Sequence, residues 1–504
     1  MSAQQSFDAW MDAFFASYYM RRPVNATFVG VHEYDHRLPD LSENGAGDTL
    51  ADMETLLQGS RDLDPAVLEP VEQVDLRLAR GFLRIQLREL ESRHFLQGNP
   101  SLYTGEAIFG VMSLFLSDFA PLEARVESAV QRLEAVPALL AQGRDRIREA
   151  PMVWTQRAHR ECTGALAFLE GGIDALGADK SALAPQLHRA AEKAAAAFAD
   201  HAAWLATDLA SHPRDDVACG ADMLSLYLRE GHFLEADAGQ FASYARARMA
   251  DSQAYLEAHA GDFGAERPGQ VLEGLRGLHA TADGYTARYR EIWDEIRGLA
   301  EERELLTWPD FPIRYVPQPA WARQAAPSLY FLPYRAPAAF HRPPVHDYLI
   351  PPLEPDLPAE EQAAFLADHN DSVIKLNHVV HHGGIGHHVQ NGYAYRSPSR
   401  VGRMAAVDCA SRIAMFCGGT MAEGWACYAT DLVREHGGLT PQEAYAEVHA
   451  RVRMCVRAVV DVELHEGRMS LDDAQRFYQT GAGMSPQAAR SEAVKNSMFP
   501  GTAL

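Results

Sequence analysis

The residues with the clearest chemical potential lie between Asn377 and Gln390, in the stretch Asn-His-Val-Val-His-His-Gly-Gly-Ile-Gly-His-His-Val-Gln. Five of the 21 histidines of the chain fall in this stretch. Neutral imidazole is a common ligand of zinc and similar ions, and it also titrates near neutral pH. A buried core does not require histidines at this density, so we expect a metal site or a proton-handling site. The alternative is a histidine-rich surface turn that binds metal adventitiously.

A helix over residues 371–382 would orient these histidines. Its buried face is predicted by apolar residues at three- and four-residue spacing, namely Val373, Leu376 and Val380. At about 100° per residue, His378 and His381 lie on a different face and can line a cavity. Because glycine is a poor helix former, the glycines at 383, 384 and 386 should break this helix. Such a break can bring His387 or His388 back towards His381.

A carboxylate from a second element would complete a metal site, and Glu423 is the best candidate. It lies on a predicted helix opposite an apolar stripe, which comprises Met421, Trp425, Tyr428 and Leu432. The spacing of Thr420 and Glu423 is also that of a capping box, in which Glu423 would only stabilise the start of the helix. The spacing alone favours neither interpretation.

Two other patterns carry possible chemistry. His32-Glu-x-x-His36 has the spacing of a zinc-binding helix, but Gly30 before it and Pro39 after it predict a loop. The second pattern lies in a long predicted helix over residues 441–466, in which Arg453, Arg457, Asp461 and His465 recur every four residues. These side chains could line a substrate pocket, with an arginine binding a carboxylate and the aspartate fixing the histidine tautomer. An ordinary ion-pair ladder on a solvated face is the alternative.

Taken together, these motifs resemble the bacterial domain-of-unknown-function family 885 (DUF885). The family's His-Glu-x-x-Pro-Gly-His-His-x-Gln signature corresponds here to residues 381–390, and its Glu-Gly-Trp-Ala-x-Tyr motif to residues 423–428. Its Arg-x-x-x-Asp-x-x-x-His pattern corresponds to residues 457–465, and residues 23–30, 34–38 and 99–103 are also similar. The resemblance covers nearly the whole chain. It implies a relationship to helical zinc metallopeptidases of the thermostable-carboxypeptidase type.

The resemblance implies a metal-dependent hydrolase in which water is activated on a divalent ion, most simply Zn²⁺, although Fe or Mn would also suit such ligands. The metal ligands would be His381, Glu423 and one of His387 and His388. The sequence departs from the family at His382, which replaces the glutamate expected to act as general base, and at Ile385, which replaces a proline. His382 would therefore be either the base or an extra ligand, with His465 and Arg457 as further catalytic residues.

Two alternatives remain open because of that departure. One is a metal-dependent lyase or an oxidative enzyme that acts on a small molecule. The other is a non-catalytic metal-binding protein descended from a peptidase. The expected substrate of an enzyme is a small molecule or a short peptide.

The bulk composition limits the partners and the location. The chain has 504 residues, 47% of them hydrophobic, with a net charge of −22, which disfavours nucleic acid and anionic membranes as partners. No apolar run has transmembrane length, and the first residues do not resemble a signal peptide. The six cysteines lack Cys-x-x-Cys spacing, as is typical of reduced thiols in a cytoplasm. We therefore expect a cytoplasmic protein.

The expected fold is mostly α: one large multi-helix domain with a small β element, similar to a metallocarboxypeptidase. A helix is predicted over residues 6–20 and an almost wholly helical region over 47–300. In residues 309–360 the composition changes, because 13 of the 28 prolines fall between 309 and 358. Short strands are predicted there at 313–316 and 328–332, and Tyr330 and Tyr334 are candidate substrate-binding residues together with Arg453. The domain thus has a helical part (1–308), a proline- and aromatic-rich segment (309–360) and a helical part with the metal site (361–504).

Overall fold

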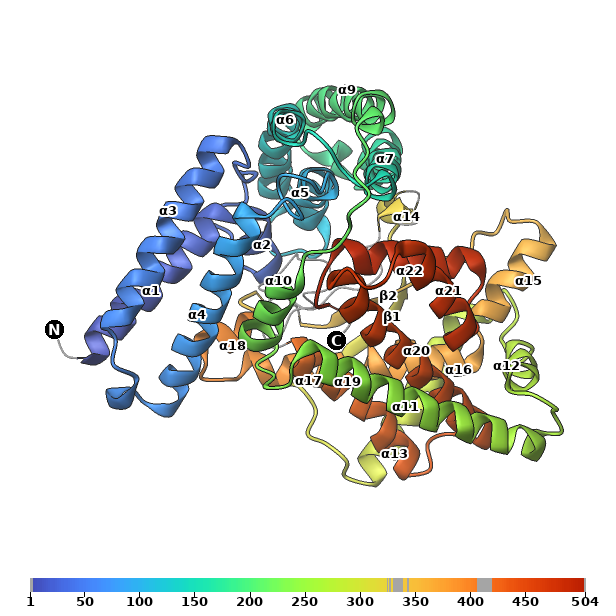
Figure 1. Ribbon diagram of the computed structural model, residues 1–504. Helices are drawn as coiled ribbons and strands as arrows, with labels where there is room; N and C mark the ends of the chain where they lie inside the picture. Colours follow the sequence, from blue (N-terminus) through green and yellow to red (C-terminus); the bar gives the residue numbers. More distant parts are fainter. Residues whose placement is uncertain are drawn as a thin grey trace.

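Helices form nearly all of the structure, which is a computed structural model (Figure 1). It describes residues 3–323, 325, 328–329, 339–341, 344–405 and 419–502. Within these residues the fold is mostly α with one two-stranded sheet, so the predicted fold class is confirmed. No helix of the described part is long and apolar enough to cross a membrane.

The N-terminal helices form one apolar cluster at the left of Figure 1. They are α1 (Ala3–Arg21), α2 (Pro23–Val29), α3 (Glu43–Gly59) and α4 (Pro70–Glu91), with α18 (Arg400–Ala405) packed against α4. The helix predicted over residues 6–20 is α1, and its apolar side chains are buried, among them Phe7, Met11 and Phe14. Residues 31–41 form turns and loop, which confirms that His32-Glu-x-x-His36 is not a helical zinc motif.

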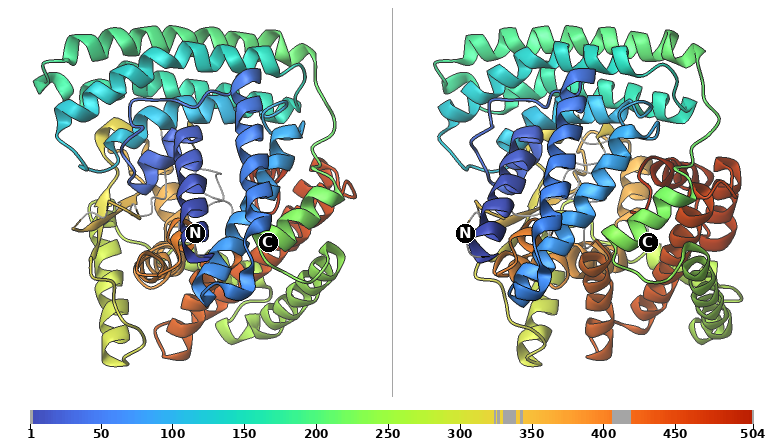
Figure 2. Two further views of the ribbon diagram at one scale, coloured as in Figure 1. Left: turned by 90° about the vertical axis from the view of Figure 1, so that its left-hand side faces the viewer. Right: turned by 60° about the vertical axis from the view of Figure 1, so that its left-hand side comes forward.

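A second layer lies across the top of the molecule in both views of Figure 2. It contains α5 (Ser101–Met112), α6 (Leu122–Arg146), α7 (Met152–Ala167), α8 (Ile173–Ala175) and α9 (Ala184–Thr207). The alanine-rich face of α9 packs on α6 and α7, because small side chains allow close approach of helix axes.

The C-terminal helices pack with the middle of the chain, as the neighbouring green and red ribbons of Figure 1 show. This group contains α10 (Ala221–Leu226), α11 (Ala238–His259), α12 (Pro268–Arg276), α20 (Pro441–His465), α21 (Leu471–Ala482) and α22 (Pro486–Met498). The long helix predicted over residues 441–466 is therefore confirmed as α20, and Thr440 caps its start through a capping box.

The remaining elements come between α12 and α20 in the chain, and most of them contribute to one core around the histidine stretch. They are α13 (Tyr285–Glu302), β1 (Ile313–Pro317), α14 (Ala320–Arg323), β2 (His346–Ile350), α15 (Ala359–Asp368), α16 (Asp371–Val373), the π-helix η10 (Ile374–His381), α17 (His387–Tyr395) and α19 (Gly419–Glu435). Strands β1 and β2 are parallel, with Tyr315 paired to Tyr348.

The strand predictions were only partly correct. The strand predicted at 313–316 is β1, but Ser328 and Leu329 lie outside strands and residues 330–332 fall outside the described residues. The partner of β1 is β2, which the sequence did not predict. Two parallel strands need a long crossover connection between them, and here that connection is residues 318–345. A short hairpin turn is therefore absent between β1 and β2, and the sequence carries no local signal for their pairing.

Candidate metal centre

The histidine stretch begins in η10, whose backbone winds more widely than an α-helix. The amide of His382 donates to the carbonyl of Asn377, five residues earlier, at 2.9 Å. Such π turns are rare and occur frequently at functional sites. The predicted buried face is present in part, since Leu376 and Val380 are buried while Val373 is half-buried. The wider turn was not predicted because the apolar spacing of one or two turns does not separate a π-helix from an α-helix.

The glycine-rich turn after η10 is held tightly by its surroundings. A Cβ atom at Gly384 would overlap the ring of Trp293, and one at Gly386 would overlap the carbonyl oxygen of His381. From the other side, Nε1 of Trp425 in α19 donates to the carbonyls of Ile385 at 3.2 Å and Gly386 at 3.0 Å. The glycines thus allow the close approach that joins η10, α17 and α19.

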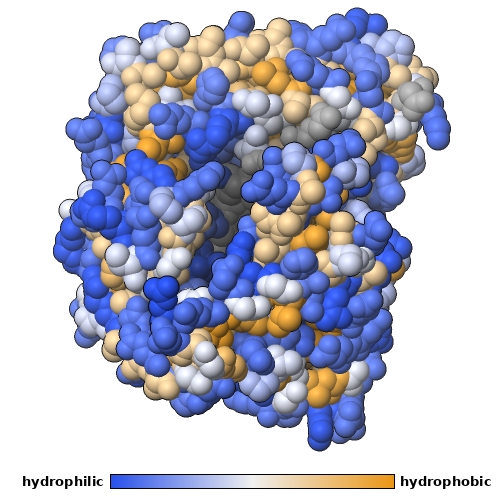
Figure 3. Space-filling view, turned by 90° about the vertical axis from the view of Figure 1, so that its right-hand side faces the viewer, coloured by the Kyte–Doolittle hydropathy of each residue, from blue (hydrophilic) through white to orange (hydrophobic). Residues whose placement is uncertain are grey.

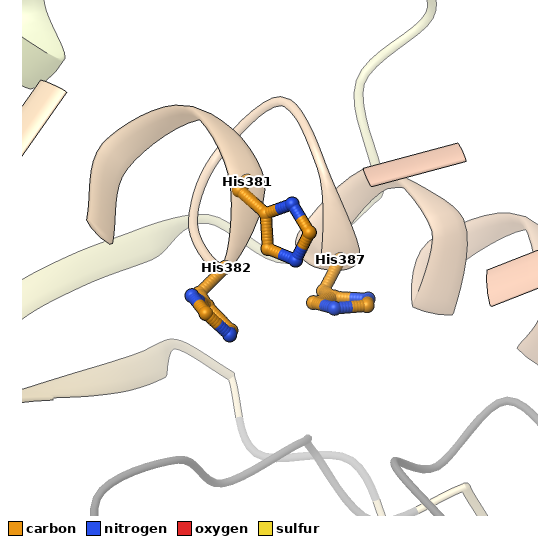
Figure 4. Close-up of side chains that lie close together, drawn as sticks. All are labelled: His381, His382 and His387. Carbon is orange, nitrogen blue, oxygen red and sulfur yellow. The ribbon is translucent and has the colours of Figure 1, made fainter. Parts of the chain in front are cut away.

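The turn brings His387, the first residue of α17, back to the end of η10, as the sequence predicted for one member of the His387/His388 pair. The ring centroids of His381 and His387 are 5.3 Å apart, and those of His381 and His382 are 4.5 Å apart. One ring nitrogen from each of these three histidines lies within 4.8 Å of the other two. Figure 4 shows the three rings gathered around a common space.

Glu423 of α19 adds a carboxylate to the three histidines. Its Oε2 lies 3.2 Å from Nε2 of His381, and its Oε1 lies 3.5 Å from Nε2 of His387. Thr420 lies inside α19 and its hydroxyl hydrogen-bonds His232, so the structure does not place Glu423 in a capping box with Thr420. The face of the molecule drawn in Figure 3 is hollowed near its centre, with many hydrophilic residues around the opening.

The electrostatic environment favours a neutral His382 and an ionised Glu423 in this cluster. Burial, with the neighbouring His381 and His387, holds the pKa of His382 well below its ordinary value of 6.5. Burial raises the pKa of Glu423, but His387 and His381 outweigh it and hold that pKa well below its ordinary value. The Nδ1 of His382 donates to the carbonyl of Asn377 at 2.9 Å. In the neutral ring, Nε2 therefore carries the lone pair.

His388 points away from this cluster, although the sequence left it as an equal candidate. Its ring meets the edge of Phe311 at 4.9 Å and stacks on His346 at 5.9 Å. Burial lowers its pKa to about 4. The structure therefore brings His387, and not His388, to Glu423.

One arginine of α20, Arg457, interacts electrostatically with Glu423 of the cluster. Nε of Arg457 is 3.5 Å from Oε2 of Glu492. Burial lowers the pKa of Arg457, but Glu492 and also Glu423 raise it, with a net rise. Arg453 is exposed and also interacts with Glu492. Arg457 is thus positioned where the charge of a substrate near Glu423 would be felt, whereas the charges that act on Arg453 do not include Glu423.

His465 does not join the cluster. Its side chain is fully buried, and its Nε2 lies 2.9 Å from the carbonyl oxygen of Asn496. Its Nδ1 accepts a hydrogen bond from the amide of Cys219 at 3.3 Å. Both ring nitrogens are therefore engaged by the backbone, and His465 fastens α20 to α22 instead of facing a substrate. Tyr330 and Tyr334 lie outside the described residues.

One packing prediction at the site was wrong. The large residues of the predicted apolar stripe do not form the buried face of α19, since Met421 is 72% exposed and Tyr428 is 47% exposed. The buried face consists of small residues instead, namely Ala422, Ala426, Ala429 and Val433. Small side chains let α19 approach η10 closely enough for Glu423 to reach the histidines. Trp425 was therefore missed as the donor that holds the glycine turn.

Comparison with known proteins agrees with the motifs. The model of a family described as "Bacterial protein of unknown function (DUF885)" matches residues 23–504. The chain belongs to the DUF885 family. No curated protein matches it.

Two solved structures share the fold of this DUF885 protein. One is described as a "putative lipoprotein of unknown function" from Shewanella oneidensis, with 19% identity, a TM-score of 0.75, and coverage of 99% of this chain and 90% of the other. The other is described as a "putative lipoprotein" from Colwellia psychrerythraea, with 15% identity, a TM-score of 0.78, and coverage of 100% and 90%. At these identities the similarity establishes the fold alone.

Proposed function

We propose that this DUF885 protein is a metal-dependent hydrolase of the metallopeptidase type, with a small molecule or short peptide as substrate. The observation that supports the proposal is the convergence of His381, His382 and His387 with Glu423. In a tetrahedral site with ligand bonds of about 2.0–2.1 Å, ligand atoms lie roughly 3.4 Å apart. The 3.2 Å and 3.5 Å separations from Glu423 to His381 and His387 fit that spacing.

The donor set also has the right chemistry for a divalent ion. The depressed pKa of His382 leaves that ring neutral, and the depressed pKa of Glu423 leaves that carboxylate ionised. Ligands of both kinds suit Zn²⁺, and they suit Fe and Mn as well. When bound, such an ion would polarise the carbonyl group of a substrate and lower the pKa of a water molecule.

The side chains of the cluster and of α20 would perform the proton transfer and bind the substrate. The Nε2 lone pair of His382 can accept a proton from water, because its Nδ1–H is already fixed on the carbonyl of Asn377. The same lone pair could instead serve as a fourth ligand atom. Arg457 is a cation near Glu423 and would bind a substrate carboxylate or a developing oxyanion.

A second candidate is a metal-dependent lyase or oxidative enzyme, or a metal-binding protein without catalysis. It is favoured by His382 itself, whose ring nitrogen lies within 4.8 Å of those of His381 and His387. Together with Glu423, these three imidazoles would fill a tetrahedral ion and leave no glutamate as base. Replacing His382 with glutamate separates the candidates. The hydrolase proposal predicts that His382→Glu gains peptidase activity towards a mixed peptide library.

The first test is elemental analysis of protein purified without added metal. We expect about one ion per chain in the wild type and strongly reduced content in His381→Ala and Glu423→Gln. His388→Gln is the matched control, because this adjacent histidine faces Phe311 and should retain the metal. A wild-type protein that is free of metal and binds none of Zn²⁺, Fe²⁺ or Mn²⁺ on titration would contradict the proposal.

The cytoplasmic location predicted from the sequence stays a prediction. The two solved structures carry descriptions as lipoproteins, which concern those proteins. Cell fractionation with an antibody to the native protein distinguishes the two locations. Recovery with the membrane fraction would contradict the sequence-based prediction.

A further inference from the structure

His232 connects three groups of helices that come from distant parts of the sequence. It directly follows the π-helix η7 (Tyr227–Gly231), and it is buried, with 8% of its surface exposed. Its two ring nitrogens contact Gly501 near the end of the chain and Thr420 in α19, the helix that carries Glu423. This residue lies outside the sequence motifs described above.

The backbone around His232 is unusual at two consecutive points. The amide of His232 donates to the carbonyl of Tyr227, five residues earlier, at 2.9 Å, which closes a π turn. The next residue, Phe233, has a φ of 58°, in the left-handed region that bulky side chains rarely adopt. Both π turns and residues in disfavoured backbone regions concentrate at functional sites. The chain therefore follows a strained path where it presents this imidazole.

The π-helix that precedes His232 is fixed on α4 of the N-terminal helices. A Cβ atom at Gly81 of α4 would overlap the carbonyl oxygen of Glu230, so the two backbones approach closely. Nη1 of Arg84 lies 2.9 Å from Oε2 of Glu230, and the hydroxyl of Tyr227 donates to Oε1 of Glu89 at 2.7 Å. The N-terminal helices thus determine where the side chain of His232 begins.

The two ring nitrogens of His232 have different roles. Nε2 lies 2.6 Å from the carbonyl oxygen of Gly501, which can only accept, so Nε2 carries the hydrogen. In the neutral ring Nδ1 then carries the lone pair and accepts from the hydroxyl of Thr420. The amide of Gly501 in turn donates to Oδ1 of the fully buried Asp461 at 3.2 Å. One chain of hydrogen bonds therefore runs from α20 through Gly501 and His232 to α19.

This chain ends less than one helical turn before the carboxylate of the metal cluster, since Thr420 precedes Glu423 by three residues in α19. Further along α19, Trp425 donates to the carbonyls of the glycine turn. Near the other end of the helix, Asp431 pairs with Arg451 of α20. The hydroxyl of Thr420 holds the first turn, so these contacts together set the distance of Glu423 from the histidines.

We propose that His232 is a positioning residue for the metal cluster. Through the hydroxyl of Thr420 it fixes the first turn of α19, and thereby the carboxylate of Glu423, against the histidines of the cluster. It acts through Thr420 and not as a ligand. The inference rests on the metal site of the proposed function, and it makes that site depend on the N-terminal helices and on the segment around Gly501.

The first test changes the hydroxyl of Thr420 and measures the affinity for Zn²⁺ by competition with a chelator. We expect Thr420→Val to weaken Zn²⁺ binding about tenfold, as loss of an outer partner of a metal ligand does, and Thr420→Ser to restore it. Thr430→Val is the matched control, because the hydroxyl of Thr430 donates within α19, to the carbonyl of Cys427 at 2.7 Å. An affinity of Thr420→Val within twofold of the wild type, or an equal loss in Thr430→Val, overturns the proposal.

The second test changes the imidazole. His232→Phe keeps a buried ring but removes both hydrogen bonds, and it should weaken Zn²⁺ binding at least as much as Thr420→Val. The double variant should match His232→Phe, because both changes act through one contact. His449→Phe is the matched control: Nε2 of His449 also donates to a backbone carbonyl, that of Ala482 at 3.2 Å, and the affinity should not change. Losses that multiply to about a hundredfold in the double variant would show independent roles and refute the assignment.

Amide hydrogen exchange of the metal-free protein separates this inference from the proposed function. Peptides from residues 419–427 should exchange about tenfold faster in Thr420→Val and His232→Phe than in the wild type, because the first turn of α19 loses its anchor. Unchanged exchange in both variants contradicts the positioning role, whether or not the protein binds metal. A wild type that binds no metal contradicts the proposed function, and the exchange rates then still decide whether His232 fixes the start of α19.

Discussion

Lys375 is a buried cation in η10, about one turn before the clustered histidines His381 and His382, and its removal gives a sharp test of what holds this segment. Its Nζ lies 3.0 Å from Oε2 of Glu443 in α20 and 3.1 Å from Oε1 of Glu295 in α13. The side chains of Lys375 and Glu443 are only 5% and 8% exposed, whereas that of Glu295 is 56% exposed. The Lys375–Glu443 pair should therefore carry most of the effect.

The magnitude follows from this difference in burial. Removing one partner of a buried ion pair costs about 3–5 kcal/mol, because the other charge is left without compensation. An exposed pair contributes at most about 1 kcal/mol. We therefore expect Lys375→Met to destabilise η10 by about 3 kcal/mol, which corresponds to roughly 100-fold faster local opening. Glu295→Gln is the matched control and should change opening less than about fivefold.

Amide hydrogen exchange of peptides from residues 374–386, measured by mass spectrometry, reports this opening. The double variant Lys375→Met/Glu443→Gln should recover most of the lost protection, because it leaves no buried charge. Glutamine at 443 can also keep the capping-box hydrogen bond to the amide of Thr440. Exchange in Lys375→Met that stays within a few-fold of the wild type, or a double variant worse than the single one, would refute the reasoning.

Three further outcomes are expected. Burial, followed by Arg144, lowers the pKa of His201 from 6.5 to about 3, so the fold keeps this ring neutral. The neutral ring contributes roughly 4–5 kcal/mol to the free energy of unfolding. This contribution is present above the unfolded-state pKa and is lost as pH falls from about 6.5 towards 3. His201→Gln should therefore flatten the acid side of a plot of unfolding free energy against pH. Gly384→Ala should lower the melting temperature and the metal content, because the new Cβ meets the Trp293 ring. Gly274→Ala in α12 is the control: the space around Gly274 is open, so the metal content should not change. Trp425→Phe removes both hydrogen bonds to the glycine turn and should weaken metal binding about 10–100-fold in a chelator competition; unchanged affinity would show that the turn holds itself.

The sequence was sufficient for many of the helices and for three members of the cluster, namely His381, His382 and Glu423. Apolar spacing predicted α1, and the long helix over 441–466 was also predicted, because a long helix repeats its pattern of side chains over several turns. The histidine density and the three glycines predicted a broken helix that returns a histidine to His381. Glu423 was found because a metal site requires a carboxylate and its motif follows at a family-like spacing. Gly30 and Pro39 correctly excluded a zinc helix at His32.

Contacts between distant parts of the chain decided the rest. Only packing shows that His387 turns to Glu423 while His388 turns to Phe311, because both begin the same helix and differ by one position. The burial of His465 against α22 and the parallel pairing of β1 with β2 likewise depend on partners far away in sequence. The ring of His232 meets Thr420 and Gly501, which follow it by 188 and 269 residues, since the orientation of a side chain is fixed by its neighbours in space.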